Sequence, residues 1–531
     1  MKNRGYGIFG AAIAVGALSG LICVAFRGAV GAMGELRPLL FNHNNPTVTH
    51  FAVFSSIFAA LYITGWLVKK FPKISGSGLP QTQALMYGRR IYNRPFTYLV
   101  VKFAGGLLSL CSGLSLGREG TSVQMGSLTG YIAADLFKVP EGKRRHLIAA
   151  GAGAGISAAF TAPLSSSILV MESLQKVTIT TTLICTLLAG GTAGIIAKII
   201  VPTNIYDKIP VVSPGPFSWH MLAIYLLMAL FFSLAGKLFS TMLIKGKRHM
   251  ARANTTGSAK HRLLKQSFIL AAITWTTGLF FTDMVGGDQT FLIKESTAAI
   301  GGNRLLNIAT LCGVTAVAAA FTVISHSSGY PGGIFLPMMT IGGLLGKLFY
   351  QMVLLLHNCT SGWLSLGEGC VCEGLSGYYI FIGMSAFFIA VARTPITGFI
   401  LISEMTGHYE TFFPTLIVGI MVFFLTHLMK VVPLNDLLYS FMIKEGEQQP
   451  IRSIIYVNAG EGSYLHNKLC RQVILPAGCR IVKLYRNKRE IPIGPLLRIE
   501  ADDSIGIEVY SDEIEQLYRA LVSFGEAGNT V

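Results

Sequence analysis

The chain has 531 residues, of which 52% are hydrophobic and only 13% are charged, about half the charged share of an average soluble domain. This composition excludes an ordinary soluble protein, and with it a soluble enzyme, and it predicts many helices that cross a lipid bilayer. The net charge of +17 would be compatible with binding to nucleic acid. An excess of lysine and arginine on the cytoplasmic side of a membrane protein explains the charge without nucleic acid.

The predicted membrane part spans residues 1–445. Its first apolar run, residues 7–26, is too long for the core of a signal peptide, so we interpret it as a retained helix. Runs of similar length follow at 177–200 and 221–239. Segment 245–265 carries seven Lys or Arg residues and no acid, which predicts a cytoplasmic loop.

Three short segments interrupt the apolar runs: "SGSGLPQ" (75–81), "GREG" (117–120) and "GGIFLP" (332–337). Their glycines allow the backbone to turn, and Pro80 suits the first turn of a helix. A helix that begins inside a membrane presents unpaired N–H groups at its positive end, and such ends bind anions. Several of them at one point would hold an anion weakly enough for it to leave again, as conduction requires.

Glu119 stands in the second of these segments, between two apolar runs. An ionisable side chain inside a membrane marks a functional site by default. At a helix N-terminus, a carboxylate can fill an anion site while it is charged and leave the site when it is protonated. The alternative interpretations are a capping carboxylate or a structural partner of Arg118.

The membrane part contains a weak internal repeat. Pro163 is followed nine residues later by Glu172, and Pro395 is followed nine residues later by Glu404. A second set of matching positions consists of Gly117, Gly126 and Gly130, which recur as Gly333, Gly342 and Gly346. Repeats of this kind build transporters whose two halves are inverted in the membrane and whose broken helices meet near the midplane.

Segment 357–376 has two glutamates and no Lys or Arg, which places it on the outer side. Cys359, Cys370 and Cys372 cluster there, and a disulfide and free thiols are both open interpretations. The other six cysteines are scattered without the spacing of a metal site, so we expect no bound metal.

Hydrophobicity falls near residue 445, and residues 446–531 are predicted to form a small soluble α/β domain. The expected elements are strands at 451–457 and 504–510, a hairpin within 479–491, a short helix at 464–473, and a helix at 513–524 that Asp512 caps.

Taken together, the three glycine segments resemble the three signatures of the CLC family of chloride channels and transporters, in the same order and spacing. "APLSSSILVMES" and "TPITGFILISEMTG" resemble the family's two proline–glutamate helices, and Tyr439 in "NDLLYS" resembles its pore tyrosine. The resemblance covers roughly residues 5–445. It implies an all-α polytopic membrane protein made of two inverted repeats of broken, tilted helices, which forms a homodimer with one pathway per subunit.

The resemblance also implies roles for particular residues. Glu119 matches the gating glutamate, which competes with chloride and carries protons. Ser77 and Tyr439 would donate hydroxyls to a central chloride, and Ile334 and Phe335 would donate backbone N–H groups. Chloride is therefore the expected ligand, and no cofactor is implied. From the residues alone, Tyr439 reads as an aromatic anchor at the membrane interface.

The sequence departs from the family at three positions. Thr121 replaces a common proline, and Gln81 replaces a common glutamate. Ser173 stands where proton-coupled members often have a second glutamate that takes protons from the cytoplasm, and serine does not titrate in the useful range. Glu172 is expected to be a structural carboxylate that needs hydrogen-bond partners. Proton/chloride exchange, which we favour, and a passive, voltage- or ligand-gated chloride channel therefore both remain open.

Two further alternatives are a fluoride carrier and a membrane receptor that senses anions. "GREGT" hints at fluoride, but fluoride-specific members usually lack the serine at position 77. A receptor would signal through the tail, and the tail has no catalytic motif.

The stretch "LPAGCRIVKLYRNKREIPIGPLLRIEADDSIGIEV" (475–509), with Asp503 at the turn before the last strand, resembles the C-terminal domain of RCK-type potassium-transport regulators, the TrkA-C module. Such modules dimerise and bind small ligands, among them cyclic di-AMP, which implies regulation from the cytosol. Arg480, Arg486, Lys488 and Arg489 are the candidates for contact with phosphates, and the alternative is a solvated basic hairpin.

Overall fold

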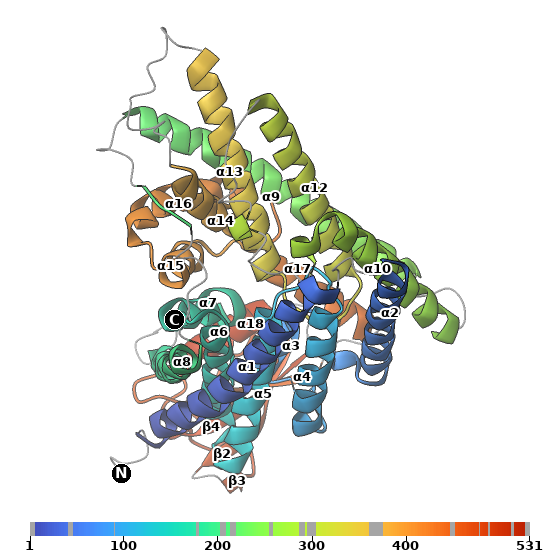
Figure 1. The fold of residues 1–531 in the computed structure, drawn as a ribbon. Helices are drawn as coiled ribbons and strands as arrows, with labels where there is room; N and C mark the ends of the chain where they lie inside the picture. The colour runs from blue at the N-terminus through green and yellow to red at the C-terminus, as the bar shows by residue number, and fades with distance from the viewer. Residues whose placement is uncertain are drawn as a thin grey trace.

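The structure of the chain is a computed structural model. It describes residues 6–40, 46–89, 91–176, 180–201, 209–212, 219–253, 259–285, 292–294, 304–359, 375–446, 452–476, 478–486, 489–510 and 514–525. Helices dominate as far as residue 446, and a small sheet follows (Figure 1).

The helices of the first half are α1 (Tyr6–Leu40), α2 (Pro46–Lys70), η2 (Pro72–Ile74), α3 (Leu79–Met86), α4 (Pro95–Cys111), α5 (Glu119–Leu136), α6 (Glu141–Phe160), α7 (Pro163–Leu169), η3 (Val170–Gln175) and α8 (Thr180–Ile200). The second half has α9 (Trp219–Ala253), α10 (Ala259–Phe280), η5 (Thr282–Met284), α12 (Arg304–Ser327), α13 (Phe335–Cys359), α14 (Ser376–Ala392), α15 (Pro395–Thr406), η7 (Tyr409–Thr411), α16 (Phe412–Leu428) and α17 (Leu434–Gly446).

Within the described residues, eight helices are long and apolar enough to cross a membrane. They include the predicted runs at 7–26, 177–200 and 221–239, although α9 is much longer than the last of these. The prediction of a loop over 245–265 is wrong for most of its length. Residues 245–253 continue α9, and residues 259–265 begin α10. Long basic side chains at helix ends can reach the membrane surface, so a basic run need not end a helix.

The recurring glycines have the same structural role in both halves. A Cβ atom on Gly126 would lie 2.1 Å from the carbonyl oxygen of Gly151, so α5 and α6 pack at the distance that only glycine permits. In the second half, a Cβ on Gly346 would lie 2.2 Å from the carbonyl oxygen of Tyr379, between α13 and α14. The repeat expected from the sequence is therefore a repeat of close helix packing.

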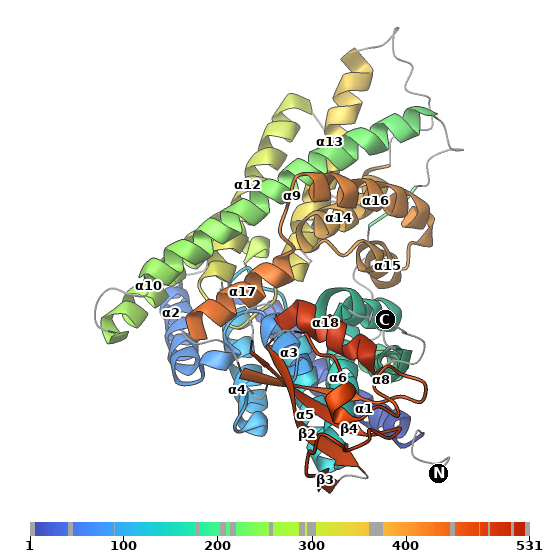
Figure 2. The same cartoon turned by 180° about the vertical axis from the view of Figure 1, so that it is seen from behind.

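The tail forms an antiparallel sheet in the order β1-β4-β2-β3, with a helix, α18. Its elements are β1 (Arg452–Asn458), β2 (Cys479–Arg486), β3 (Arg489–Ile491), β4 (Ser504–Tyr510) and α18 (Ile514–Phe524). These match the predicted strands, hairpin and final helix, whereas Asp512 lies outside the described residues. Figure 2 shows the sheet and α18 beside α3, α5 and α6.

The helix predicted at 464–473 does not form. The segment has turns and one 3-10 turn, η8 (Cys470–Gln472), and Asn467 has a positive φ of 68°. Its backbone bonds elsewhere instead. The N–H of Asn467 donates to the carbonyl of Ile499 at 2.9 Å, and the N–H of Cys470 donates to the carbonyl of Leu497 at 2.9 Å. Tertiary pairing with a distant segment thus overrides the local helical pattern.

Candidate functional site

The three glycine segments meet at one place inside the helical part. Gly117 and Gly333 exchange two backbone hydrogen bonds, of 2.8 and 2.6 Å, as an isolated antiparallel bridge. The N–H of Gly76 donates to the carbonyl of Gly329 at 3.1 Å, and the N–H of Gly332 donates back to the carbonyl of Gly76 at 3.2 Å. These bonds satisfy the backbone where the helices are broken, which a membrane interior requires.

Glu119 is the first residue of α5 and is 1% exposed. Its Oε1 accepts a hydrogen bond from the backbone N–H of Leu336 at 3.1 Å, and the N–H of Phe335 also faces this carboxylate. Its Oε2 has no hydrogen-bond partner among the described residues. The carboxylate of one half therefore lies at the positive N-terminus of α13 in the other half.

The glycines around Glu119 are required for space. A Cβ on Gly117 would lie 2.1 Å from Oε2 of Glu119, and a Cβ on Gly333 would lie 2.4 Å from its Oε1. Any side chain at either position would push the carboxylate out of its present place.

Ser77 lies next to the segment that carries Glu119. A Cβ on Gly120 would be 2.5 Å from the carbonyl oxygen of Ser77 and 2.9 Å from the Cα of Gly333, so the starts of α3, α5 and α13 converge. Ser77 is 2% exposed, and its hydroxyl has no hydrogen-bond partner in the described part of the chain. A buried hydroxyl without a protein partner is suited to a ligand. Gly78 has a φ of 83°, and Pro80 is in the first turn of α3, as predicted.

Ile334 and Phe335 are buried, at 0% and 1% exposure, where α13 begins. Tyr439 belongs to α17 and is 7% exposed. Its ring lies 5.9 Å from the ring of Tyr87, which follows the last residue of α3. The structure therefore brings Ser77, Glu119, Ile334 and Phe335 together at the helix starts, and it places Tyr439 against the opposite end of α3.

Lys102 is a residue of this site that sequence reasoning missed. It is completely buried on α4, and its ammonium group donates to the carbonyls of Ile74 and Gly76, both at 2.8 Å. The lysine thereby holds the loop that carries Ser77 in place. A lone lysine within the apolar run "VVKFAGG" was the available signal.

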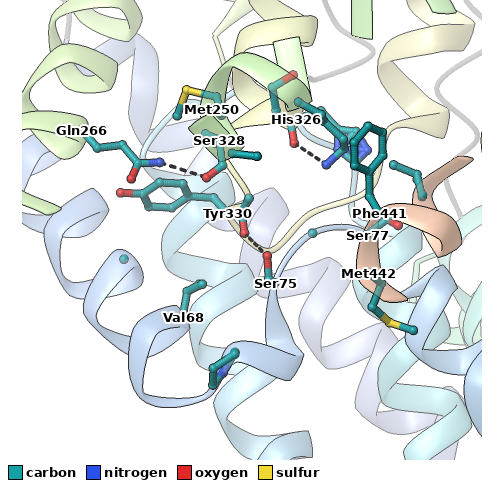
Figure 3. Close-up of a pocket in the computed structure, with 18 of the residues that line it drawn as sticks. Val68, Ser75, Ser77, Met250, Gln266, His326, Ser328, Tyr330, Phe441 and Met442 are labelled. Atoms are coloured by element: carbon teal, nitrogen blue, oxygen red, sulfur yellow. Dashed lines mark hydrogen bonds between the residues drawn. The ribbon is translucent and has the colours of Figure 1, made fainter. Parts of the chain in front are cut away.

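A cavity of about 380 Å³ extends from Ser77 to the basic ends of α9 and α10 (Figure 3). Its lining includes the cations Lys69, Lys247 and Arg262. His326, also in the lining, is 1% exposed, and neither ring nitrogen has a hydrogen-bond partner among the described residues. The cavity thus offers positive charge and polar groups along a route to Ser77.

The cavity wall is held by bonds between its elements. Ser75 donates its hydroxyl to the carbonyl of Gly329 at 2.7 Å, and Gln266 donates its amide to the carbonyl of Ser328 at 3.0 Å (Figure 3). The shape of the cavity is therefore fixed by hydrogen bonds between the elements of the fold that line it.

The two proline–glutamate helices cap each other. Glu172 accepts hydrogen bonds from the N–H groups of Ile396 and Thr397 and from the hydroxyl of Thr397, at 3.2, 2.8 and 2.6 Å. Glu404 accepts the matching bonds from Leu164 and Ser165, at 2.9, 2.8 and 2.8 Å. Each carboxylate lies at the start of the other helix, so α7 and α15 run antiparallel. Glu172 thus has the hydrogen-bond partners that were expected for a carboxylate in this position.

Ser173 faces a second cavity, of about 550 Å³, that Glu172 and Arg393 also line. The amide of Asn435 donates to the hydroxyl of Ser173. Lys176 and Asp436 form an ion pair in the same lining. Position 173, where proton-coupled members often have a glutamate, therefore lies beside a cavity and next to polar side chains.

Two of the arginines predicted to meet phosphates are already bonded within the tail. Arg480 donates to Glu508 at 2.7 Å, and Arg486 donates to both oxygens of Asp503, at 2.9 and 2.7 Å. Hydrogen bonding to Asp503 raises the pKa of Arg486 above its usual value. Arg489 is exposed on β3.

Some predicted positions have no structural account. Lys488, Cys370 and Cys372 lie outside the described residues, as does the side chain of Cys359, so the disulfide stays untested.

Comparison with known proteins gives two family matches. The family "Voltage gated chloride channel" matches residues 59–427, and the TrkA-C domain family matches residues 454–522. Curated relatives are named H(+)/Cl(-) exchange transporter ClcA. The protein from Yersinia pseudotuberculosis is 30% identical over 419 residues, covering 76% of this chain and 81% of the relative. The protein from Citrobacter koseri is 29% identical over 450 residues, covering 83% and 90%.

Solved structures share the fold. A slow cyanobacterial Cl-/H+ antiporter aligns with a TM-score of 0.71 at 24% identity, covering 83% of this chain and 98% of that one. A eukaryotic CLC transporter aligns with a TM-score of 0.66 at 17% identity, covering 88% and 78%.

Proposed function

The chain belongs to the voltage-gated chloride channel family, and we propose that this integral membrane protein exchanges chloride for protons. The observation that carries the proposal is the place of Glu119. Its carboxylate accepts from the N–H of Leu336 at the start of α13, beside the buried hydroxyl of Ser77, which lacks a partner among the described residues. A carboxylate at that point occupies a position suited to an anion.

We propose that chloride binds between the N–H groups of Ile334 and Phe335 and the hydroxyl of Ser77. We further propose that the hydroxyl of Tyr439 reaches the same anion from α17, which contributes Leu438, Phe441 and Met442 to the cavity that Ser77 lines. Charged Glu119 and chloride compete for the electropositive helix starts. When Glu119 takes up a proton, it loses its attraction to those N–H groups, swings away, and chloride takes its place. None of these four proposed donors is a fixed cation, so binding is weak enough for release.

The cavity lined by Lys69, Lys247 and Arg262 is the proposed cytosolic access route to Ser77. Its basic lining raises the local chloride concentration, and the positive-inside rule assigns this side to the cytosol. The tail is then cytosolic as well, because α17, which leads into it, contributes Phe441 and Met442 to the same lining.

Protons must reach Glu119 from the cytosol without a glutamate at position 173. Glu172 is held by three hydrogen bonds to the start of α15, so we assign it a structural role. The cavity beside Ser173 has room for water, and we propose that water carries the proton there. A passive chloride channel is the second candidate. The observation that favours it is the hydrogen bond between Asn435 and Ser173, because neither side chain can take up a proton at ordinary pH.

Reversal potential against a pH gradient decides between the two. Purified protein in liposomes with fixed chloride and different pH values on the two sides should show a potential that shifts with pH. A potential set by chloride alone would identify a channel, and no chloride flux at all would point to an anion sensor. Replacing chloride by fluoride in the same liposomes tests the fluoride alternative.

We further propose that the protein is a homodimer and that its TrkA-C domain regulates transport in response to a small ligand. Cyclic di-AMP is the ligand to test, with Arg489 and Lys488 as candidate contacts, because Arg480 and Arg486 are bonded to Glu508 and Asp503. Calorimetry on the full-length protein tests binding. No heat at high micromolar cyclic di-AMP would remove this ligand.

A further inference from the structure

Three tyrosines from three distant parts of the chain lie in contact where the tail meets the helical part. The ring of Tyr87, after α3, lies 5.9 Å from that of Tyr439 on α17 and 4.7 Å from that of Tyr518 on α18. Their exposures are 0%, 7% and 2%. We call Tyr87, Tyr439 and Tyr518 the tyrosine cluster. It joins the C-terminal domain to the helix that begins at the anion site.

Tyr87 is tied to α3 as well as to its two neighbours. Its hydroxyl accepts a hydrogen bond from the side-chain amide of Gln83, one turn earlier, at 3.1 Å. The helix α3 has eight residues and starts directly after Gly78. Tyr87 follows its C-terminal end and Ser77 precedes its N-terminal end, so a shift of Tyr87 moves the short helix and with it the Ser77 loop. Displacing one ring of the cluster therefore has two routes to the anion, through α3 and through Tyr439.

The docking of the C-terminal domain is tight enough to transmit such a displacement. A Cβ on Gly88 would lie 2.5 Å from the carbonyl oxygen of Ile454 in β1. The N–H of Gly142 donates to the hydroxyl of Ser504 at 3.0 Å, and Lys143 pairs with Asp502 at 3.6 Å. Figures 1 and 2 both show α18 lying close to α3. Closely packed contacts transmit small shifts because they have no free space to absorb them.

We propose that Tyr518 of the C-terminal domain is a positioning residue for anion transport, because its ring holds Tyr87 and thereby sets the positions of Tyr439 and the Ser77 loop. The inference rests on the proposed function, since it assumes that the anion binds near Ser77 and Tyr439. It also gives the domain a defined point of action. A ligand or partner that moves α18 would alter anion binding by moving one aromatic ring.

A purely structural role for Tyr518 makes a different prediction. If the ring only holds the domain in place, its loss lowers stability and the amount of folded protein without changing how transport depends on chloride concentration. Positioning instead changes the apparent chloride KM, while the maximal rate per folded protein stays nearly the same. The split between these two parameters separates the two roles.

The experiment measures chloride flux from liposomes as a function of chloride concentration for the full-length protein. Tyr518→Ala should raise the apparent KM about three- to tenfold, the size expected for loss of one aromatic contact, with the maximal rate within about twofold of wild type. Tyr518→Phe keeps the ring and should restore the wild-type KM. Tyr518→Leu keeps apolar volume without the ring and should resemble Tyr518→Ala, which provides a second variant should the alanine protein not fold.

Two controls make the result specific. Val509→Ala removes a completely buried side chain from β4 in the same domain. It should lower the melting temperature yet leave the KM unchanged. In a Tyr87→Leu background, Tyr518→Ala should cause no further change in KM, because the ring through which it acts is gone.

An unchanged KM in Tyr518→Ala and Tyr518→Leu would overturn the proposal, as would an equal change in Val509→Ala or an additive change in the Tyr87→Leu background. Failure of the proposed function is a different result. Wild-type protein would then pass no chloride, or its reversal potential would not change with pH. The KM comparison does not depend on whether the reversal potential changes with pH.

Discussion

Oε1 of Glu119 accepts a hydrogen bond from the backbone N–H of Leu336 at 3.1 Å, across 217 positions of the chain. The two residues belong to different halves of the repeat, and they meet because the glycine segments at 117–120 and 332–337 pair with each other. An acidic group on one half thus occupies the positive helix end of the other half.

Glu119→Gln should abolish proton coupling and preserve chloride flux. The amide keeps the size of the carboxyl group but cannot take up or release a proton, and without a negative charge it no longer competes with chloride for the N–H groups of α13. Reversal potential at a fixed chloride gradient and varied pH measures the coupling. A variant that still responds to the pH gradient would contradict the assigned role.

Ser173→Glu should increase the rate of proton transport relative to chloride transport. Ser173 is 4% exposed and lines a cavity of about 550 Å³, so a longer carboxylate has space there. A titratable group there replaces a serine that cannot carry a proton. Proton uptake, followed with a pH electrode during chloride efflux, checks this. Ser173→Gln has nearly the same size and should not show the increase.

Glu404→Ala should destabilise the protein by about 1–3 kcal/mol, because two part-buried donors of Ser165 and one exposed N–H of Leu164 lose their acceptor. Glu172→Ala should cost a similar amount, since its bonds to Ile396 and Thr397 are equivalent. Melting temperature in detergent measures both.

Glu172→Gln then separates stability from proton transport. Its amide oxygen can still accept the two bonds from Thr397, whereas its NH2 group cannot accept the bond from Ile396, so it should be more stable than Glu172→Ala and should retain proton coupling. Loss of coupling in Glu172→Gln protein that remains folded would show that Glu172 carries protons.

Lys102→Met should reduce chloride flux by about tenfold, the effect of roughly 1.4 kcal/mol. The carbonyls of Ile74 and Gly76 lose their donor, so the Ser77 loop is held less firmly. Chloride efflux from liposomes measures the change. Lys138→Met removes an exposed lysine and is the control. Equal fluxes in wild type and Lys102→Met would show that the loop is fixed by its own backbone bonds alone.

Gly142→Val should separate the C-terminal domain from the helical part. A Cβ at this position would lie 2.0 Å from Oδ1 of Asn458 and 2.5 Å from Oγ of Ser504, closer than any normal contact. Limited proteolysis should therefore release the tail more quickly than in wild type. Gly494→Val is the control, because a Cβ on Gly494 would have no neighbouring atom within 4 Å, and it should be cleaved at the wild-type rate.

The start of α3 could be predicted from the sequence, because glycine and proline act on the local backbone conformation. Gly78 adopts a positive φ and Pro80 lies in the first turn of α3, as their chemistry requires. The β-branched runs in the tail likewise became β1 and β4. The helix expected at 464–473 failed because the segment bonds to residues near 499, a pairing that no local pattern contains. The loop expected at 245–265 failed because charge composition reports the side of the membrane and not the end of a helix.

The sequence by itself determined that this is a membrane protein with interrupted helices, a carboxylate beside glycines, and a small mixed tail, since these follow from composition, turn chemistry and periodicity. Only the tertiary structure decided that Glu119 meets Leu336, that Lys102 supports the Ser77 loop, and that Tyr518 touches Tyr87. Those contacts join segments hundreds of residues apart or separate elements of the fold, and packing geometry fixes them, which short-range preferences along a chain do not encode.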